Sequence, residues 1–233
     1  MTDVDGLRAR LASVRDRIRR AAERCGRDPR SVLLLAVSKT KPSEEVLAAY
    51  AAGQRCFGES YAQELVDKAE ALSELADLEW HFVGRLQSNK AKLVASRAAV
   101  VHAVDSERLA RELGKRAEGR ARPLDVLVEV NVGGEATKGG VDPVALEPVL
   151  RAIEAIPSLR LRGLMSIPPH TGEPEASRPF HRALAALRAA HGGAGRLRDL
   201  SMGMTDDLEI AIDEGATIVR VGTAIFGPRA PRG

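Results

Sequence analysis

Two lysines follow an apolar run of strand length in the stretch LLLAVSKTKP, residues 33 to 42. Lys39 and Lys41 stand just after the serine that ends this run and just before a proline. An amine at the end of a buried strand can act as a nucleophile when desolvation or a neighbouring cation lowers its pKa. Alternatively, both lysines are solvated residues of a loop that opens a helix. Lys39 is therefore a candidate whose role depends on the fold around it.

A second group of polar residues lies in the last two apolar runs. LSMGMTDDLEIA passes through a glycine into a helix start, and IVRVGTAIFG passes through Gly222 and Thr223 into a short apolar segment. Backbone N–H groups at such turns, with the hydroxyls of Ser201 and Thr223, can cradle a phosphate. Helix caps and ordinary turns explain the same residues without a ligand. Both interpretations stay open at this point.

Arg220 places a permanent cation inside the apolar stretch TIVRVG. Alternation along a strand puts Ile218 and Arg220 on one side, and a buried guanidinium requires an acceptor. Arg220 can donate to a ligand at the strand end, pair with Glu129, or point outward between helices.

These residues need a scaffold that gathers strand ends. Eight apolar runs alternate with segments of helical period; the runs cover residues 31–37, 55–57, 80–83, 100–104, 124–132, 160–167, 197–202 and 217–221. This order predicts an α/β protein with a parallel sheet closed into a (β/α)8 TIM barrel, whose chemistry lies at the carboxyl ends of the strands. A doubly wound open sheet is the alternative, but its first turn is usually glycine-rich, and here that turn reads SKTKP. We expect a single domain over residues 1–228, with an extra N-terminal helix whose apolar face runs from Val4 to Cys25, and a loose tail over 229–233.

Composition narrows the class of protein. The chain has 233 residues, of which 44% are hydrophobic, and its net charge is +3. The basic residues are interspersed with acidic ones and aromatics make up only 3%, so we expect no nucleic-acid partner. No apolar run approaches the roughly 20 residues of a membrane helix and the N-terminus has no apolar leader, so we expect a cytoplasmic protein with no membrane partner. Cys25 and Cys56 are expected to be reduced, buried thiols, and their spacing predicts no metal site.

Six motifs together resemble those of the pyridoxal-phosphate homeostasis proteins, single-domain barrels similar to the barrel domain of alanine racemase. They are LLAVSKTKP, FGESYAQE, WHFVGRLQSNK, GLMSI, SMGMTDDLEIAI and VRVGTAIFG, within a match from about Leu7 to Gly227. The resemblance implies pyridoxal 5'-phosphate (PLP) as cofactor, with Lys39 as its Schiff-base lysine and Arg220 as donor to the pyridine nitrogen. It further implies cofactor contacts from Ser60, Met165, Ser201, Gly222 and Thr223.

Two positions depart from the family pattern. The family usually reads GENY where this chain has GESY, which places Ser60 in the position of an asparagine amide. It commonly has proline where this chain has Arg85. We expect Ser60 to weaken cofactor binding without abolishing it.

The function implied is a carrier that buffers PLP and other B6 vitamers, passes the cofactor to apo-enzymes, and is a monomer without a catalytic role. An arginine at the ring nitrogen favours the unprotonated ring, which supports carbanion chemistry poorly. The alternatives are a PLP-dependent amino-acid racemase or decarboxylase, for which no opposing base is evident beyond Tyr50 and Tyr61, and a ligand-free scaffold.

Overall fold

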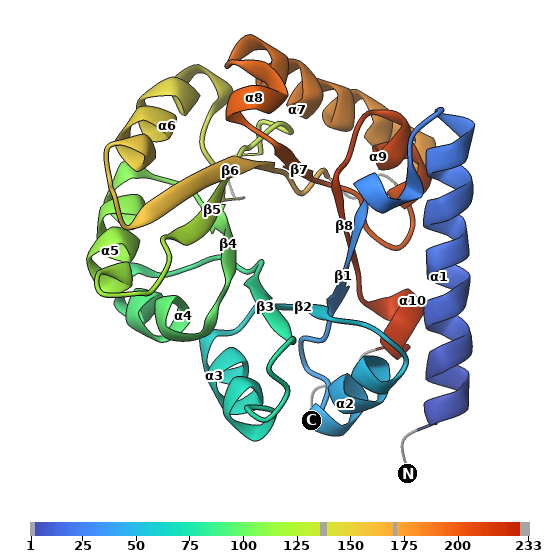
Figure 1. The fold of residues 1–233 in the computed structure, drawn as a ribbon. Coiled ribbons are helices and arrows are strands. Elements are labelled where there is room, and N and C mark those ends of the chain that lie inside the picture. The colour runs from blue at the N-terminus through green and yellow to red at the C-terminus, as the bar shows by residue number, and fades with distance from the viewer. Residues whose placement is uncertain (1–2, 136–138, 170–171, 229–233) are drawn as a thin grey trace.

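The strands form a closed barrel in the computed structural model, which describes residues 3–135, 139–169 and 172–228. Within them eight parallel strands follow one another in chain order, and β1 pairs with β8 (Figure 1). The strands are β1 (Leu33–Val37), β2 (Cys56–Glu59), β3 (Glu79–Phe82), β4 (Val100–Val104), β5 (Leu124–Glu129), β6 (Leu159–Met165), β7 (Asp199–Ser201) and β8 (Ile218–Val221). The predicted (β/α)8 TIM barrel is confirmed and the open sheet is excluded. The predicted tail, residues 229–233, lies outside the described residues.

Helices surround the barrel, as expected when each strand is followed by a crossover to the next parallel strand. The α-helices are α1 (Val4–Arg24), α2 (Ser43–Ala51), α3 (Ala62–Ala71), α4 (Ala91–Arg97), α5 (Glu107–Ala117), α6 (Leu146–Glu154), α7 (Arg178–Ala190), α8 (Gly193–Arg196), α9 (Leu208–Asp213) and α10 (Thr223–Phe226). Short 3-10 turns are η1 (Pro29–Ser31), η2 (Ser88–Lys90), η3 (Pro143–Ala145) and η4 (Pro174–Ser177). No helix of the described part is both long and apolar enough to cross a membrane.

The extra N-terminal helix is present as α1, at the outer edge of the ring in Figure 1. It packs against α2, α9 and α10. Since α10 has only four residues, α1 supplies apolar cover beside the pair formed by β1 and β8. The residues that it buries are Leu7, Leu11, Val14, Ile18, Ala21 and Ala22. Val4 and Cys25, at the two ends of the predicted apolar face, are exposed, so the prediction that Cys25 is a buried thiol is wrong.

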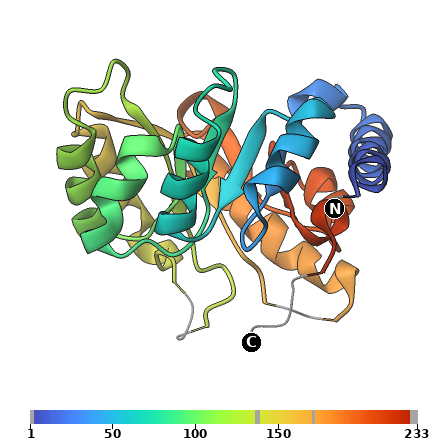
Figure 2. The same cartoon turned by 90° about the horizontal axis from the view of Figure 1, so that it is seen from below.

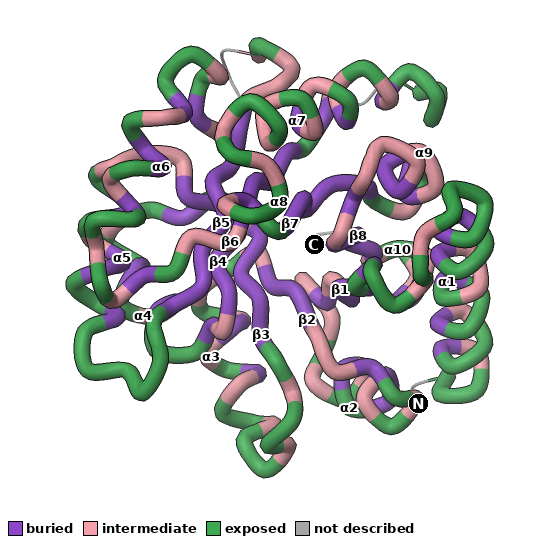
Figure 3. The backbone as a smooth tube through the Cα atoms, turned by 45° about the horizontal axis from the view of Figure 1, so that its top comes forward, coloured by how far each residue is buried: buried purple, intermediate pink, exposed green. Residues whose placement is uncertain are grey.

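Two layers of side chains make up the core. The larger lies between strands and helices: Leu34 and Ala36 of β1 belong to it. Their neighbour Leu35 belongs to a smaller cluster with Val83 and Ile218, as the alternation along a strand requires. Figure 2 shows the strands between helices in a view from below. In Figure 3, which is coloured by burial, the strands are mostly buried and the exposed residues lie mostly on the outer ring.

The barrel interior also contains polar side chains, which is unusual for a layer normally filled by branched apolar residues. His81, His102, Ser201 and Arg220 are all at most 5% exposed. Cys56, predicted to be buried, is only half-buried at the first residue of β2, and both cysteines are free thiols.

Candidate functional site

Lys39 stands on a tight turn at the end of β1. Ser38 continues the strand by donating its N–H to the Gly58 carbonyl at 2.9 Å, and the N–H of Lys41 closes the turn on the Ser38 carbonyl at 3.0 Å. Between the two lysines, Thr40 has a φ of 65°, the only positive φ among the described residues other than glycine. A β-branched residue in the left-handed region is strained and persists only where its surroundings hold it. The N–H of Thr40 donates to Glu64 at 2.8 Å, which is one such restraint.

A buried ion pair supports this turn from below. Lys68 of α3 donates to Oε1 of Glu59 at 2.6 Å and to the Ser38 carbonyl at 2.8 Å. The Ser38 hydroxyl donates to the same Glu59 oxygen at 2.7 Å. Burial raises the pKa of Glu59, whereas Lys68 acts in the opposite direction. The backbone beside Lys39 is therefore held by Glu59 of β2 and by Glu64 and Lys68 of α3.

A cavity of about 230 Å³ opens at the carboxyl ends of the strands, where Lys39 and Arg220 both line it. Five of the seven predicted cofactor-binding residues lie on its wall, namely Lys39, Ser60, Arg220, Gly222 and Thr223. They come from β1, β2 and β8 or the turns that follow these strands. The closed barrel thus brings together residues that are up to 184 positions apart in the sequence, since Lys39 and Thr223 share one wall.

Arg220 points into the barrel rather than outward between helices. Its Nη1 donates to the carbonyl and hydroxyl of Ser201 at 2.6 and 2.9 Å, and its Nη2 donates to the Ser166 carbonyl at 2.8 Å. Burial lowers the pKa of Arg220 to about 10, while Glu129 favours the charged form, so the guanidinium stays protonated at neutral pH. Within the described residues it makes no hydrogen bond to Glu129, and its Nε makes none at all. Because Arg220 lines the cavity, this N–H is a donor available to a ligand there.

Ser201 and Met165, the other two predicted contacts, lie behind the cavity wall. Both are fully buried, and neither lines the cavity. Met165 packs with Val100, Ala103 and Leu127. The Ser201 hydroxyl is used by Arg220 and by Nδ1 of His102, at 2.9 Å each. This arrangement makes Ser201 a support for Arg220 and gives no basis for a phosphate contact.

The wall also includes three residues after β7 that were not assigned to the site from the sequence. Met204, Thr205 and Asp206 line the cavity beside Gly222 and Thr223. They follow β7, and the sequence indicated only a helix start at this point. Gly203, with a φ of 88°, sets the path of this loop, because a side chain there would collide with Ala211. Thr205 could have been proposed from the sequence, because it is a hydroxyl residue two positions after Gly203, the glycine that follows this strand.

Two other lysines could take the place of Lys39, namely Lys41 and Lys138, which stands in the glycine-rich stretch GGEATKGG. Lys41 lines the same cavity, but its amine donates to the carbonyls of Phe226 and Pro228 at 2.7 and 3.0 Å. Lys138 lies outside the described residues.

The two departures from the family pattern meet in one place. Ser60 and Arg85 both line an adjacent cavity of about 460 Å³, which also contacts Lys39 and Tyr61. Gly84 separates them, and a side chain on Gly84 would overlap the Ser60 carbonyl. Arg85 also helps to lower the pKa of Glu129, which burial raises. Ser60 therefore lines both cavities, whereas Arg85 lines only the adjacent one.

The fold and the cavity define a class: a (β/α)8 barrel with a lysine, a buried arginine and a hydroxyl-bearing turn on the wall of one cavity. The chain matches the family model for the alanine racemase N-terminal domain over residues 9–230. It is 49% identical to the pyridoxal phosphate homeostasis protein of Pseudomonas aeruginosa, over 94% of each chain, and 46% identical to that of Aquifex aeolicus, over 94% of this chain and 97% of the relative. PipY of Synechococcus elongatus, solved with PLP bound, is 36% identical with a TM-score of 0.79, over 95% of this chain and 100% of PipY. The chain belongs to the pyridoxal phosphate homeostasis protein family.

Proposed function

We propose that this chain binds PLP in the cavity at the carboxyl ends of its strands and serves to hold and supply the cofactor. The observation that carries the proposal is that Lys39, Arg220 and the Gly222–Thr223 turn line one cavity. In this proposal Lys39 forms the Schiff base with the aldehyde, Arg220 donates to the ring nitrogen, and the turn binds the phosphate. PipY, with PLP bound, supports the choice of ligand.

The residues present fit such a ligand at each of its polar groups. The Nε of Arg220 makes no hydrogen bond within the described chain, and a ring nitrogen is a suitable acceptor for it. At the other end, the first N–H groups of α10 have no acceptor within that helix, and the Thr223 and Thr205 side chains flank them on the cavity wall. Asp206 lies on the same wall, but it is exposed and its charge is screened by solvent.

Arg220 also limits what the bound cofactor can do. PLP supplies an aldehyde for amines and a ring that withdraws electrons, most strongly when the ring nitrogen is protonated. Arginine cannot give up its proton, so it leaves that nitrogen unprotonated. The three acceptors around Arg220 hold it in this donating role. Storage and release of the cofactor therefore suit this site better than the removal of a proton from an amino acid.

A racemase or decarboxylase remains the second candidate because of Tyr61. This residue is 46% exposed and lines the adjacent cavity with Lys39, so a phenol lies near the lysine. Tyr50 donates to Asp77 and does not line either cavity. Tyr61 follows β2 and Lys39 follows the neighbouring strand β1, so the two residues come from adjacent turns.

The proposal is tested with the purified full chain loaded with PLP. Borohydride reduction followed by peptide mapping should place the cofactor on Lys39, and mixing with an apo-enzyme that requires PLP should restore the activity of that enzyme. Incubation with single amino-acid enantiomers should give no turnover near the rate of about 1 per second and above that is typical of enzymes. Turnover at that rate that disappears in Tyr61→Phe would establish the second candidate instead. Absence of any bound PLP would reject both.

The same proposal includes the recipients of the cofactor and the oligomeric state. We expect the recipients to be apo-enzymes that use PLP, and we expect the chain to act as a monomer, which light scattering of the loaded protein measures directly.

A further inference from the structure

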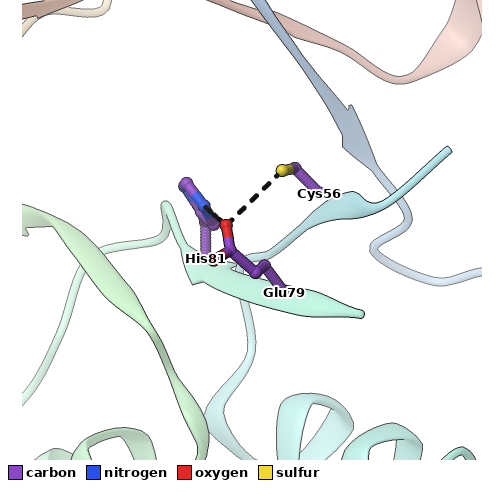
Figure 4. Close-up of side chains that lie close together, drawn as sticks. All are labelled: Cys56, Glu79 and His81. Carbon is purple, nitrogen blue, oxygen red and sulfur yellow. Dashed lines mark hydrogen bonds and ion pairs between the residues drawn. The ribbon is translucent and has the colours of Figure 1, made fainter. Parts of the chain in front are cut away.

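The amino ends of β2 and β3, at the opposite end of the barrel from the cavity, bring three metal-binding side chains together. Cys56 is paired directly across from Glu79, and Gly58 is paired across from His81. Residues two apart on a strand share a face, so His81 lies on the same side as Glu79 and Cys56. Figure 4 shows the three side chains converging, with Glu79 between the other two.

The distances among their donor atoms suit one small cation. Sγ of Cys56 lies 3.7 Å from Oε2 of Glu79, and Nε2 of His81 lies 3.9 Å from the same oxygen. All three donor atoms are within 4.8 Å of one another. Bonds of about 2.0 to 2.3 Å to a tetrahedral zinc ion place ligand atoms roughly 3.3 to 3.8 Å apart. Movements of the side chains by less than the length of one bond would therefore complete the geometry.

His81 supplies an observation independent of this spacing. Its side chain is 3% exposed, and its Nε2 has no hydrogen-bond partner among the described residues, although a buried polar atom normally has one. Nδ1 of the same ring lies 2.9 Å from Nε2 of His102, which fixes the orientation of the imidazole. A ring held in this way at one nitrogen, with the other aimed at a carboxylate and a thiol, is the usual arrangement of a metal-binding histidine.

We propose that Cys56, Glu79 and His81 bind a divalent transition ion of the zinc type, with water as the fourth ligand. One sulfur, one nitrogen and one oxygen donor form a set that suits this ion. The Glu79 side chain is 59% exposed, so an ion and a water molecule can reach the site from solvent.

Charge and proton balance are consistent with this assignment. In the metal-free protein the Cys56 thiol donates toward Glu79, and burial with the nearby Glu79 charge raises the pKa of the thiol to about 12. The ion would replace this proton, which passes to solvent, and the thiolate and carboxylate would then neutralise its two positive charges. Arg162, the cation that acts on Glu79, is already paired with Asp125 and Asp199.

The sequence alone did not indicate this cluster, because Cys56 lies 23 residues before Glu79 and 25 residues before His81. Only the register between two neighbouring strands places them in contact. This inference does not depend on PLP, and its test uses the full chain without added cofactor.

The test uses Co²⁺ as a spectroscopic probe and Zn²⁺ in competition with a chromophoric chelator. The wild-type chain should bind one equivalent, show a thiolate-to-cobalt charge-transfer band, and release close to one proton on binding. Cys56→Ser should remove that band and weaken Zn²⁺ binding at least tenfold, and Glu79→Gln should weaken it about tenfold.

Cys25→Ser is the matched control, because the Cys25 thiol also donates to a carboxylate, Asp213 at 3.0 Å, but among the described residues it belongs to no group of three metal-binding side chains. It should bind both ions like the wild type. A wild-type chain without the charge-transfer band, a band that survives in Cys56→Ser, or a band lost in Cys25→Ser would overturn the assignment. If a variant does not fold, the wild-type spectrum together with Cys25→Ser decides.

Discussion

Nζ of Lys68 lies 2.6 Å from Oε1 of Glu59, and the side chains are 7% and 0% exposed. The pair lies directly beneath the turn that carries Lys39, because both partners also contact Ser38. A buried pair contributes little compared with apolar packing, but loss of one partner leaves the other charge without compensation. The cost of disrupting this pair should therefore exceed that of any exposed salt bridge in the chain.

Lys68→Met should lower the free energy of unfolding by about 3 to 5 kcal/mol at neutral pH. Burial already raises the pKa of Glu59 in the folded protein, and loss of the ammonium raises it further. A carboxyl whose pKa is higher folded than unfolded destabilises the fold only above its unfolded pKa, so the deficit should be small near about pH 4.5 and larger near about pH 7.5. Urea unfolding at both pH values measures it, with the exposed Lys92→Met as control. Equal deficits at the two pH values would mean that lost packing, rather than charge, dominates.

Lys39→Ala should remove covalent fixation of PLP by borohydride while the barrel stays folded. The residue is half-buried at a strand end and contributes to neither core layer. Lys41→Ala is the control: it should keep the fixation, since the Lys41 amine is held by the Phe226 and Pro228 carbonyls. Mass spectrometry of the reduced proteins separates these outcomes. Cofactor fixed to the Lys39→Ala protein would assign the linkage to another lysine.

Thr223→Val keeps the shape of the side chain and removes its hydroxyl. We expect PLP affinity to fall by about 1 to 3 kcal/mol if that hydroxyl contacts a charged phosphate oxygen. Thr223→Ser should restore most of the affinity. Equilibrium titration of the two variants and the wild type gives the comparison, and an unchanged dissociation constant in Thr223→Val would leave the backbone N–H groups as the phosphate ligands.

Arg220→Lys keeps the positive charge but loses the planar arrangement of donors. A single ammonium on a flexible chain cannot reproduce the contacts to Ser201 and Ser166, so unfolding should become easier by about 1 to 3 kcal/mol. Arg220→Glu should be worse, because its carboxylate would face two backbone carbonyls. The absorption maximum of bound PLP should shift in Arg220→Lys. Two variants as stable as the wild type would show that these three hydrogen bonds contribute nothing measurable.

Thr40→Gly should stabilise the protein slightly. A threonine at φ 65° costs about 1 to 3 kcal/mol, and glycine removes that cost while losing roughly 0.5 to 1 kcal/mol through the entropy of the unfolded chain. Thr40→Ala, which keeps a Cβ without branching, should lie between the two. Chemical denaturation of the three proteins checks this order; a destabilised Thr40→Gly would mean that the threonine side chain makes a compensating contact.

The sequence was sufficient for the fold because each strand is an apolar run bounded by turn residues. Its limits are clearest at β2, predicted over 55–57 and observed over Cys56–Glu59. Glu59 was not predicted as a strand residue because a carboxylate is rarely buried, and the sequence does not show that Lys68 of α3 pairs with it. The error has the opposite sign at β5 and β7, whose ends were predicted too late because apolar residues continue into the loops after them.

For the site, cations inside apolar stretches were the informative signal. Lys39 and Arg220 stand out in the sequence, and the structure brings them to one cavity. Ser201 and Thr205 could not be ranked in the same way, since both are hydroxyl residues near the end of β7. Only the three-dimensional structure shows that Ser201 turns inward to Arg220 while Thr205 lines the wall.

His102 links the polar side chains of the barrel interior, so substitutions there should depend on one another more than substitutions in the apolar layer outside it. One of its ring nitrogens is used by His81 and the other by Ser201, whose hydroxyl in turn accepts from Arg220. Replacing any member of this series leaves a buried polar atom without a hydrogen-bond partner, which lowers the free energy of unfolding by about 1 to 3 kcal/mol. Exchanges between apolar residues of similar volume usually cost under about 1.5 kcal/mol. Substitutions should therefore accumulate independently in the apolar layer between strands and helices. In the polar barrel interior, a substitution at one position should be accompanied by a substitution at the position that it hydrogen-bonds.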